Sequence, residues 1–187
     1  VNSISQHTIN FINNAPNVVT NIQETTKTCD LQPNESSCEI ILPSFTTKQN
    51  HEVLGWSTNK NATEASYQPG EIVSFSDDTT LYTITRGKFS ASFVNQHKTH
   101  FNLSHESDSC YVYNSTSNCR VATPTASKQS ANDESEFLGW STDSTSAAPE
   151  IAAGGSASIS GNTAFYSIAS IPPTIIYVQF VNQDPNG

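Results

Sequence analysis

The four cysteines are the residues whose type and spacing point most clearly to a particular chemistry. They form two pairs, Cys29 with Cys38 and Cys110 with Cys119, and each pair encloses eight residues. A metal or redox centre would need thiolates at ligand spacing, but no CxxC occurs and no histidine lies at such a spacing from either pair. The pattern therefore predicts one disulfide within each pair and an oxidising compartment. Closing a ring of this size removes about 2.7 kcal/mol of unfolded-state entropy.

Two other groups of side chains could hold a cation. Three histidines and two carboxylates lie close together in the second half of the chain, namely His97, His100, His105, Glu106 and Asp108. Their spacing matches no standard ligand set, and the first half has no counterpart, so we interpret the histidines as solvated loop residues. Two acidic runs could bind calcium, Asp77-Asp78 and Asp133-Glu134-Ser135-Glu136. They lack the ligand periodicity of calcium loops, so no metal site and no cofactor is predicted.

No catalytic motif is recognisable in the chain. It has no Gly-x-Ser-x-Gly, no phosphate-binding glycine loop and no His-Glu-x-x-His. Four Asn-x-Ser/Thr sequons occur, at Asn34, Asn61, Asn102 and Asn114, and such matches arise by chance in a chain rich in serine and threonine. An internal Lys–Asn isopeptide bond is a further hypothesis, which an intact mass would test by the loss of ammonia. We therefore expect no enzyme.

The chain repeats itself. The segment Leu54-Gly55-Trp56-Ser57-Thr58 recurs 84 positions later as Leu138-Gly139-Trp140-Ser141-Thr142. The cysteine pairs recur at an offset of 81, and Phe11-Ile12-Asn13 recurs as Phe93-Val94-Asn95 and again as Phe180-Val181-Asn182. Such self-similarity indicates a repeat array. It predicts a first domain at 1–86, a second at 87–170, and at 171–187 a proline linker with the first strand of a truncated third repeat.

The predicted fold class is mostly β, with small mixed sheets and α+β as the open alternative. Opening strands alternate around Ile9 and Ala91, β-branched residues are frequent, and the chain has six leucines and no methionine. At most one short helix fits in each unit, near 44–50 and 127–133. The connector Arg86-Gly87-Lys88 is short, and Ile171-Pro172-Pro173 is stiffened by proline.

The core motif of each unit is Leu-Gly-Trp, formed by Leu54, Gly55 and Trp56 and again by Leu138, Gly139 and Trp140. An exposed indole could stack on a sugar ring. Because the motif occurs in both units, we interpret each tryptophan instead as the centre of a small core, with the preceding glycine allowing close backbone approach.

These segments carry a family resemblance. The chain resembles the Listeria–Bacteroides repeat, the internalin-type B repeat of bacterial cell-surface proteins, at Val53–Thr58 with Thr79–Tyr82 and at Phe137–Thr142 with Thr163–Tyr166. The resemblance implies a small β-grasp-like module, used in tandem on extracellular stalks and adhesins and without catalytic residues. The cysteine pairs depart from the family pattern.

The composition limits the classes of binding partner that the chain can have. The net charge is −9, charged residues make up 13%, and serine, threonine and asparagine together provide 66 of the 187 residues. Such a surface repels phosphate backbones, which excludes nucleic-acid binding as a main function. No apolar run reaches the ~20 residues of a membrane helix, so no membrane insertion is expected within this segment.

These features lead to one main hypothesis and two alternatives. The main hypothesis is a monomeric, non-catalytic spacer of a bacterial surface adhesin or appendage, extracellular and extended, that projects a binding domain from the cell. In the first alternative the repeats themselves bind a glycan or protein of a host or neighbouring cell, with Tyr67, Tyr111 and Tyr113 as candidate contacts. The second is an accessory domain of a hydrolase.

Overall fold

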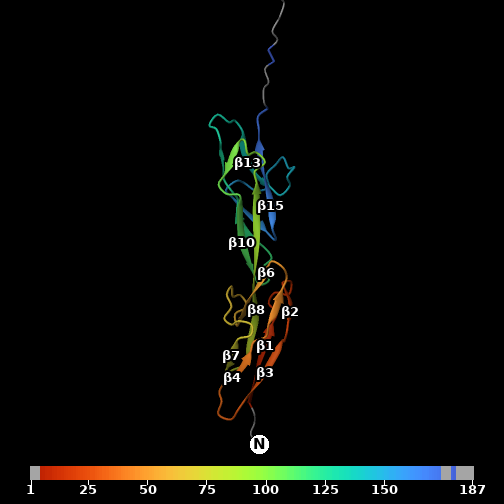
Figure 1. Ribbon diagram of the computed structural model, residues 1–187, viewed down its shortest axis with the longest axis vertical. Helices are drawn as coiled ribbons and strands as arrows, with labels where there is room; N and C mark the ends of the chain where they lie inside the picture. The colour runs from red at the N-terminus through yellow and green to blue at the C-terminus, as the bar shows by residue number, and fades with distance from the viewer. Residues whose placement is uncertain (1–4, 174–177, 180–187) are drawn as a thin grey trace, which may run out of the picture. The chain divides into compact units, whose positions relative to one another are not determined.

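The computed structural model describes residues 5–173 and 178–179 (Figure 1). Within these residues every regular element is a β-strand, which confirms the predicted mostly β class. The strands are β1 Ser5–Ile12, β2 Val19–Ile22, β3 Thr26–Leu31, β4 Cys38–Ile41, β5 Phe45–Thr47, β6 His51–Ser57, β7 Ile72–Phe75, β8 Thr79–Val94, β9 Phe101–Leu103, β10 Ser107–Tyr113, β11 Cys119–Ala122, β12 Ala126–Lys128, β13 Glu136–Ser141, β14 Ser156–Ile159 and β15 Thr163–Ser170.

The short helices expected near 44–50 and 127–133 do not form, so the α+β alternative is wrong for the described residues. The first segment contains β5, which pairs with β2, and the second contains part of β12, which pairs with β9. Thr46 and Thr47 are β-branched and favour the extended backbone, and Asn50 lies at φ 66°, outside the helical region. The β-grasp-like arrangement that the resemblance implied stays a prediction.

The long strand β8 organises the main sheet. That sheet has seven strands in the order β13-β15-β8-β1-β3, and β6 and β10 also pair with β8. The first half of β8 runs parallel to β1 and antiparallel to β6, whereas its second half is antiparallel to β10. Four two-stranded sheets complete the fold: β2–β5, β4–β7, β9–β12 and β11–β14.

The expected connector Arg86-Gly87-Lys88 lies inside β8 and is not a loop. Gly87 is paired with His51 of β6 on one side and with Val112 of β10 on the other. A Cβ atom at this position would come within 2.7 Å of the His51 ring and 2.9 Å of the Val112 side chain, so a larger residue here would force these side chains to shift. The domain boundaries at 86 and 170 stay predictions, and the expected third repeat lies largely at 174–177 and 180–187, outside the described residues.

The described residues fall into two compact units. The first comprises 5–92, 107–122 and 156–164, and its core is centred on Trp56, which is fully buried. The Phe11 and Phe45 rings meet the indole edge-on, with centroids 5.0 and 4.9 Å away. Further apolar side chains complete this core: Ile9, Ala15, Val18, Val19, Ile40, Leu42, Phe75 and Leu81.

The second compact unit contains 93–106, 123–155 and 165–173, and its core is aromatic. Trp140 is fully buried, with the Phe93 and Phe137 rings 5.1 and 5.4 Å from the indole. Phe165 stacks on Phe93 at 5.6 Å, and Phe101 meets Phe137 edge-on at 5.4 Å. Such edge-to-face pairs add to the free energy gained by burying each ring.

Candidate functional site

Each tryptophan is held by the main chain around it. The Trp56 indole N–H donates to the Pro43 carbonyl at 2.9 Å, and the Trp140 indole N–H donates to the Pro124 carbonyl at 3.2 Å. The Trp56 main chain exchanges hydrogen bonds with Tyr67, as the Trp140 main chain does with Ile151. A buried indole whose only polar atom is already bonded has no face for a sugar, so both rings act as core residues.

The glycines before the tryptophans permit a close backbone approach. Gly55 and Gly139 have φ of +134° and +144°, a region that side-chain-bearing residues rarely adopt. A Cβ atom would lie 2.2 Å from the Tyr67 carbonyl oxygen at Gly55, and 2.3 Å from that of Ile151 at Gly139. Leu54 and Leu138, the remaining members of the motif, are half-buried.

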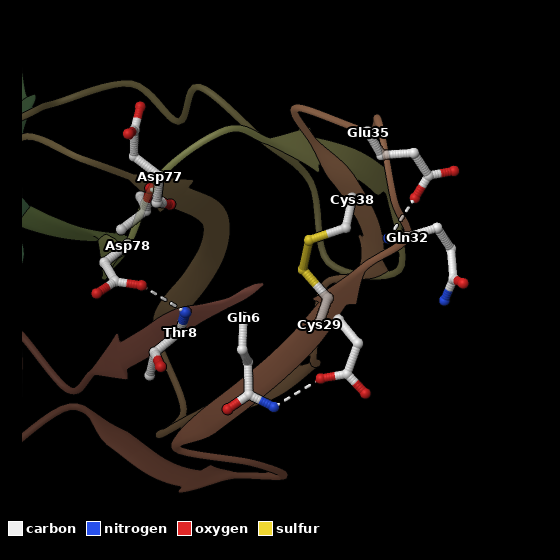
Figure 2. The surroundings of a disulfide bond; sticks show 10 residues. Gln6, Thr8, Cys29, Gln32, Glu35, Cys38, Asp77 and Asp78 are labelled. Carbon is white, nitrogen blue, oxygen red and sulfur yellow. Dashed lines mark hydrogen bonds between the residues drawn. A yellow bond between two sulfur atoms is a disulfide. The ribbon is translucent and has the colours of Figure 1, made fainter. Parts of the chain in front are cut away.

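Both expected disulfides are present, Cys29–Cys38 and Cys110–Cys119, with Cα atoms 6.1 and 5.9 Å apart. Cys29 lies on β3 of the seven-stranded sheet, and Cys38 begins β4, which pairs with β7 (Figure 2). Cys110 on β10 and Cys119 on β11 repeat this arrangement. Each disulfide therefore fastens a strand of the main sheet to a separate two-stranded sheet.

The acidic residues near the disulfides cap main-chain and amide groups. Asp30 accepts a hydrogen bond from the Gln6 amide at 2.7 Å, and Asp78 accepts one from the Thr8 N–H at 2.7 Å (Figure 2). Asp77 accepts one from the Ser76 hydroxyl at 3.1 Å, and Asp108 accepts one from the Ala122 N–H at 2.7 Å. These contacts give the carboxylates a structural role in turns and strand ends.

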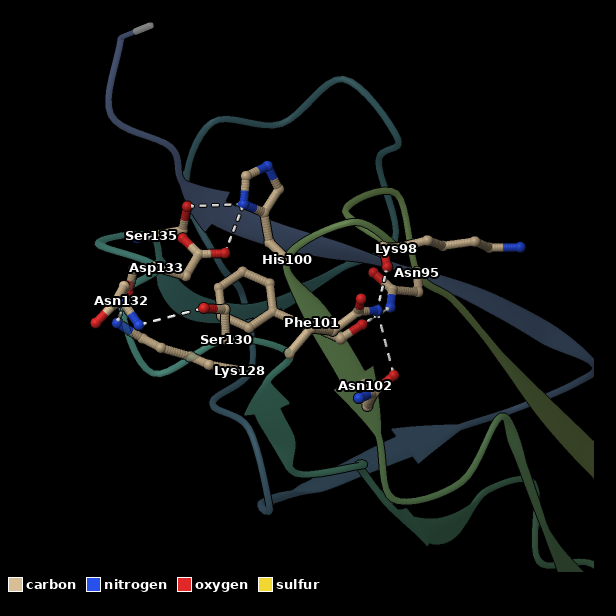
Figure 3. A network of polar contacts seen from close by, with 11 residues as sticks. Asn95, Lys98, His100, Phe101, Asn102, Lys128, Ser130, Asn132, Asp133 and Ser135 are labelled. Carbon is tan, nitrogen blue, oxygen red and sulfur yellow. Dashed lines mark hydrogen bonds and ion pairs between the residues drawn. The ribbon is translucent and has the colours of Figure 1, made fainter.

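A serine, a histidine and an aspartate meet at one edge of the second unit (Figure 3). The His100 Nδ1 atom lies 2.8 Å from the Asp133 carboxylate and 3.1 Å from the Ser135 hydroxyl. A catalytic relay uses the two ring nitrogens separately, whereas both contacts here fall on the same nitrogen. Ser135 is also only 1% exposed, so this network holds a loop together and offers no nucleophile to a substrate.

The network perturbs two ionisable groups. Hydrogen bonds from the Ser135 hydroxyl and main chain, together with the His100 ring, lower the pKa of Asp133 to about 2. Partial burial and the nearby His100 lower the pKa of His97 from 6.5. His105 packs its ring edge-on against Phe93 at 5.6 Å. Among the described residues, no three or more His, Cys, Asp or Glu side chains gather as a metal site would require.

The three candidate tyrosines do not form one patch. Tyr67 is half-buried and packs near Phe75 in the core of the first unit. Tyr111 and Tyr113 lie two positions apart on β10, with the Arg86 guanidinium 5.0 Å above the Tyr111 ring. Tyr111 is 46% exposed, and Tyr113 lines a polar pocket of about 300 Å³.

The sequons differ in accessibility. Asn34, Asn61 and Asn102 are exposed, whereas Asn114 is buried with a fully engaged side chain. Sequence reasoning treated Asn114 only as a sequon and missed this role. The signal available in the sequence was weak, because its partners Ala62 and Thr85 lie 52 and 29 residues away.

The comparisons with known proteins bear on the first of the two units found in the sequence. Residues 7–84 match the model of the Listeria-Bacteroides repeat domain. This segment is a Listeria-Bacteroides repeat. No curated protein and no solved structure matches the chain significantly. The Listeria-Bacteroides repeat is found in bacterial surface proteins, and the disulfides are compatible with such a location. The described residues contain no helix long and apolar enough to span a membrane.

The second sequence unit repeats the Listeria-Bacteroides repeat at 7–84 element by element. In both, the tryptophan strand pairs antiparallel with the strand that closes the unit, β6 with β8 and β13 with β15, and the register is interrupted at the same place. In both, a disulfide encloses eight residues and the indole N–H meets a proline carbonyl. Sequence repetition and local geometry therefore agree.

Proposed function

We propose that the chain is a non-catalytic, extracellular spacer in a bacterial surface protein, where it projects a binding domain away from the cell. The observation that carries the proposal is the tandem occurrence of a repeat with its own disulfide and its own tryptophan-centred core. Repeats built on one plan can be added in series, each contacting only its neighbours. The location of the matching family in bacterial surface proteins supports the same function.

The polar surface suits such a spacer. Charged residues are few, and hydroxyl and amide side chains dominate, so the surface stays hydrated without a strong field that would attract a charged partner. The disulfides also suit an oxidising environment outside the cytoplasm. The family is found in bacterial surface proteins, and the proposal assigns this chain the more specific function of a stalk within such a protein.

Small-angle scattering tests the spacer proposal. A single compact domain of 187 residues has a radius of gyration of about 16 Å. We expect a value well above this limit, with a pair-distance distribution that has a long tail. A value near 16 Å would refute the spacer. Protease digestion of intact cells should, in addition, release the chain from the surface, and protection from the protease would contradict an extracellular location.

A second candidate function is recognition of a glycan or protein by the repeats themselves. The specific observation in its favour is the polar pocket beside Tyr113, lined by Asn14, Lys60, Asn61, Thr63, Tyr113, Asn114, Ser115 and Thr116. Hydroxyl, amide and phenol groups of this kind suit a sugar. Binding on a glycan array should disappear on Tyr113→Ala and persist in a Tyr67→Phe control. Absence of binding by the unaltered chain would contradict this candidate.

A further inference from the structure

Two corners of the chain are built alike, one in each compact unit. We call Asn14, residues 59–63 and Thr83–Thr85 the first corner, and Gln96, residues 143–147 and Ser167–Ala169 the second corner. The Asn14 N–H donates to the Thr83 hydroxyl at 2.9 Å, and its side-chain amide donates to the Lys60 carbonyl. In the second corner the Gln96 N–H donates to the Ser167 hydroxyl at 2.8 Å, and its side-chain amide donates to the Ser144 carbonyl at 3.1 Å.

The first corner is closed by Asn114, which lies in the loop between Cys110 and Cys119. The Thr85 N–H donates to Asn114 Oδ1 at 3.1 Å, and the Asn114 N–H donates to the Thr85 carbonyl at 3.1 Å. The Asn114 side-chain amide also donates to the Ala62 carbonyl at 3.0 Å. All of these residues belong to the first unit, and Thr85 is fully buried.

Among residues 5–173 and 178–179, none takes the place of Asn114 at the second corner. A hollow of about 340 Å³ is found there, lined by Gln96, His97, Ser144–Ala147 and Ser167–Ala169. Phe137 is paired with Ala169 as Val53 is paired with Thr85. The main-chain N–H and C=O of Ala169 are therefore directed as those of Thr85 are, toward the hollow. No side chain or loop residue of the described chain bonds to them, and Ala169 is only half-buried.

We propose that the second corner is a docking site for the cysteine-closed loop of a further repeat of this kind. The asparagine of that loop, at the place of Asn114, bonds the main chain of Ala169 and lines the hollow, as Asn114 lines the pocket at the first corner. This inference rests on the likeness of the two corners and stands whether or not the chain is a spacer.

The chemistry of the hollow agrees with this occupant. Its lining carries hydroxyl, amide and main-chain groups, the His97 imidazole and no carboxylate. The loop tip at the first corner, Tyr113–Thr116, carries no charge. An uncharged tip enters such a hollow without the cost of desolvating an ion. By analogy with Asn114, its asparagine side-chain oxygen accepts from the Ala169 N–H, and its main-chain N–H donates to the Ala169 carbonyl.

Amide hydrogen exchange tests the proposal on the full chain and on a chain extended after Ser170 by a second copy of residues 87–170. In the natural chain, the Thr85 N–H should be protected and the Ala169 N–H should exchange faster. In the extended chain, the Ala169 N–H should exchange slower by about tenfold or more, since it gains a buried hydrogen bond. An unchanged Ala169 rate in an extended chain whose added copy has its native disulfide would overturn the proposal.

Matched variants separate the asparagine contact from general packing. In the added copy, replacing the residue that corresponds to Asn114 by alanine should return Ala169 to its fast exchange. The same replacement at the residue corresponding to Asn118, which is exposed, should leave Ala169 protected. Equal effects of the two variants would overturn the proposal. Protection of Ala169 that grows with the concentration of the natural chain would assign the hollow to a second copy and would also overturn it.

Discussion

The Cys29–Cys38 disulfide offers the sharpest test of how the first repeat is stabilised. It closes a ring of about ten residues, for which the loss of unfolded-state entropy amounts to about 9 cal/mol/K, or about 2.7 kcal/mol at room temperature. In the folded protein it also fastens β3 of the main sheet to β4 of a separate two-stranded sheet. The double variant Cys29→Ala/Cys38→Ala should therefore lower the free energy of unfolding of the first repeat by about 2.7 kcal/mol.

The two buried indoles allow this effect to be measured locally. The indole N–H groups of Trp56 and Trp140 bond to different proline carbonyls, so their proton resonances report on the two cores separately. In a urea titration the Trp56 resonance of the double variant should be lost at lower urea than in the unaltered chain. The shift of the midpoint is the loss of about 2.7 kcal/mol divided by the m-value of about 1–3 kcal/mol/M, which gives about 1–3 M urea.

The matched control is Cys110→Ala/Cys119→Ala, which leaves the first ring intact. Its ring carries Asn114, which bonds Thr85 and Ala62 of the first compact unit, so the control should also shift the Trp56 transition, but less than the Cys29→Ala/Cys38→Ala variant does. A loss below about 1 kcal/mol for the first-ring variant, or an equal shift of Trp56 in both variants, would refute the reasoning that each disulfide stabilises its own repeat.

Three further predictions concern the core glycine and two ionisable groups. Gly55→Ala should lower the stability by about 3 kcal/mol or more in thermal unfolding, because its Cβ meets the Tyr67 carbonyl, whereas Gly161→Ala, with open space around it, should change the stability little. The folded state lowers the pKa of His97, so the free energy of unfolding is retained above pH 6.5 and falls as the pH drops below that value. His97→Gln should flatten this pH dependence in urea titrations at pH 5–8. The pKa of Asp133 is about 2, so its contribution to the free energy of unfolding is present above about pH 4 and is lost as the pH falls toward 2. Asp133→Asn should remove this acid-dependent loss of stability. An unchanged dependence of stability on acid pH would contradict the hydrogen-bond network around His100.

The features that sequence reasoning predicted correctly are those encoded by short spacing. The disulfide partners lie nine positions apart, and the two rings recur at the same place of each unit, so pairing could be inferred without a fold. The mostly β class followed from β-branched residues and the lack of a helical stripe. These signals are local, and tertiary context does not overturn them.

The features that sequence reasoning missed depend on pairing between distant segments. The sequence of residues 44–50 allows a short helix, yet β5 is fixed in this segment by its pairing with β2. Arg86-Gly87-Lys88 resembles a linker by composition. In the fold, β6 and β10 pair with β8 on either side of Gly87, and the strand therefore continues through this segment. Asn114 carries no local signal for its contacts with Ala62 and Thr85, because only the folded sheet brings these residues together.

Peptide mapping without reduction tests most directly whether the chain consists of like units, each with a disulfide of its own. Every protease fragment pair should contain Cys29 with Cys38 or Cys110 with Cys119. A crosslink from either cysteine of the first pair to either cysteine of the second would contradict this account.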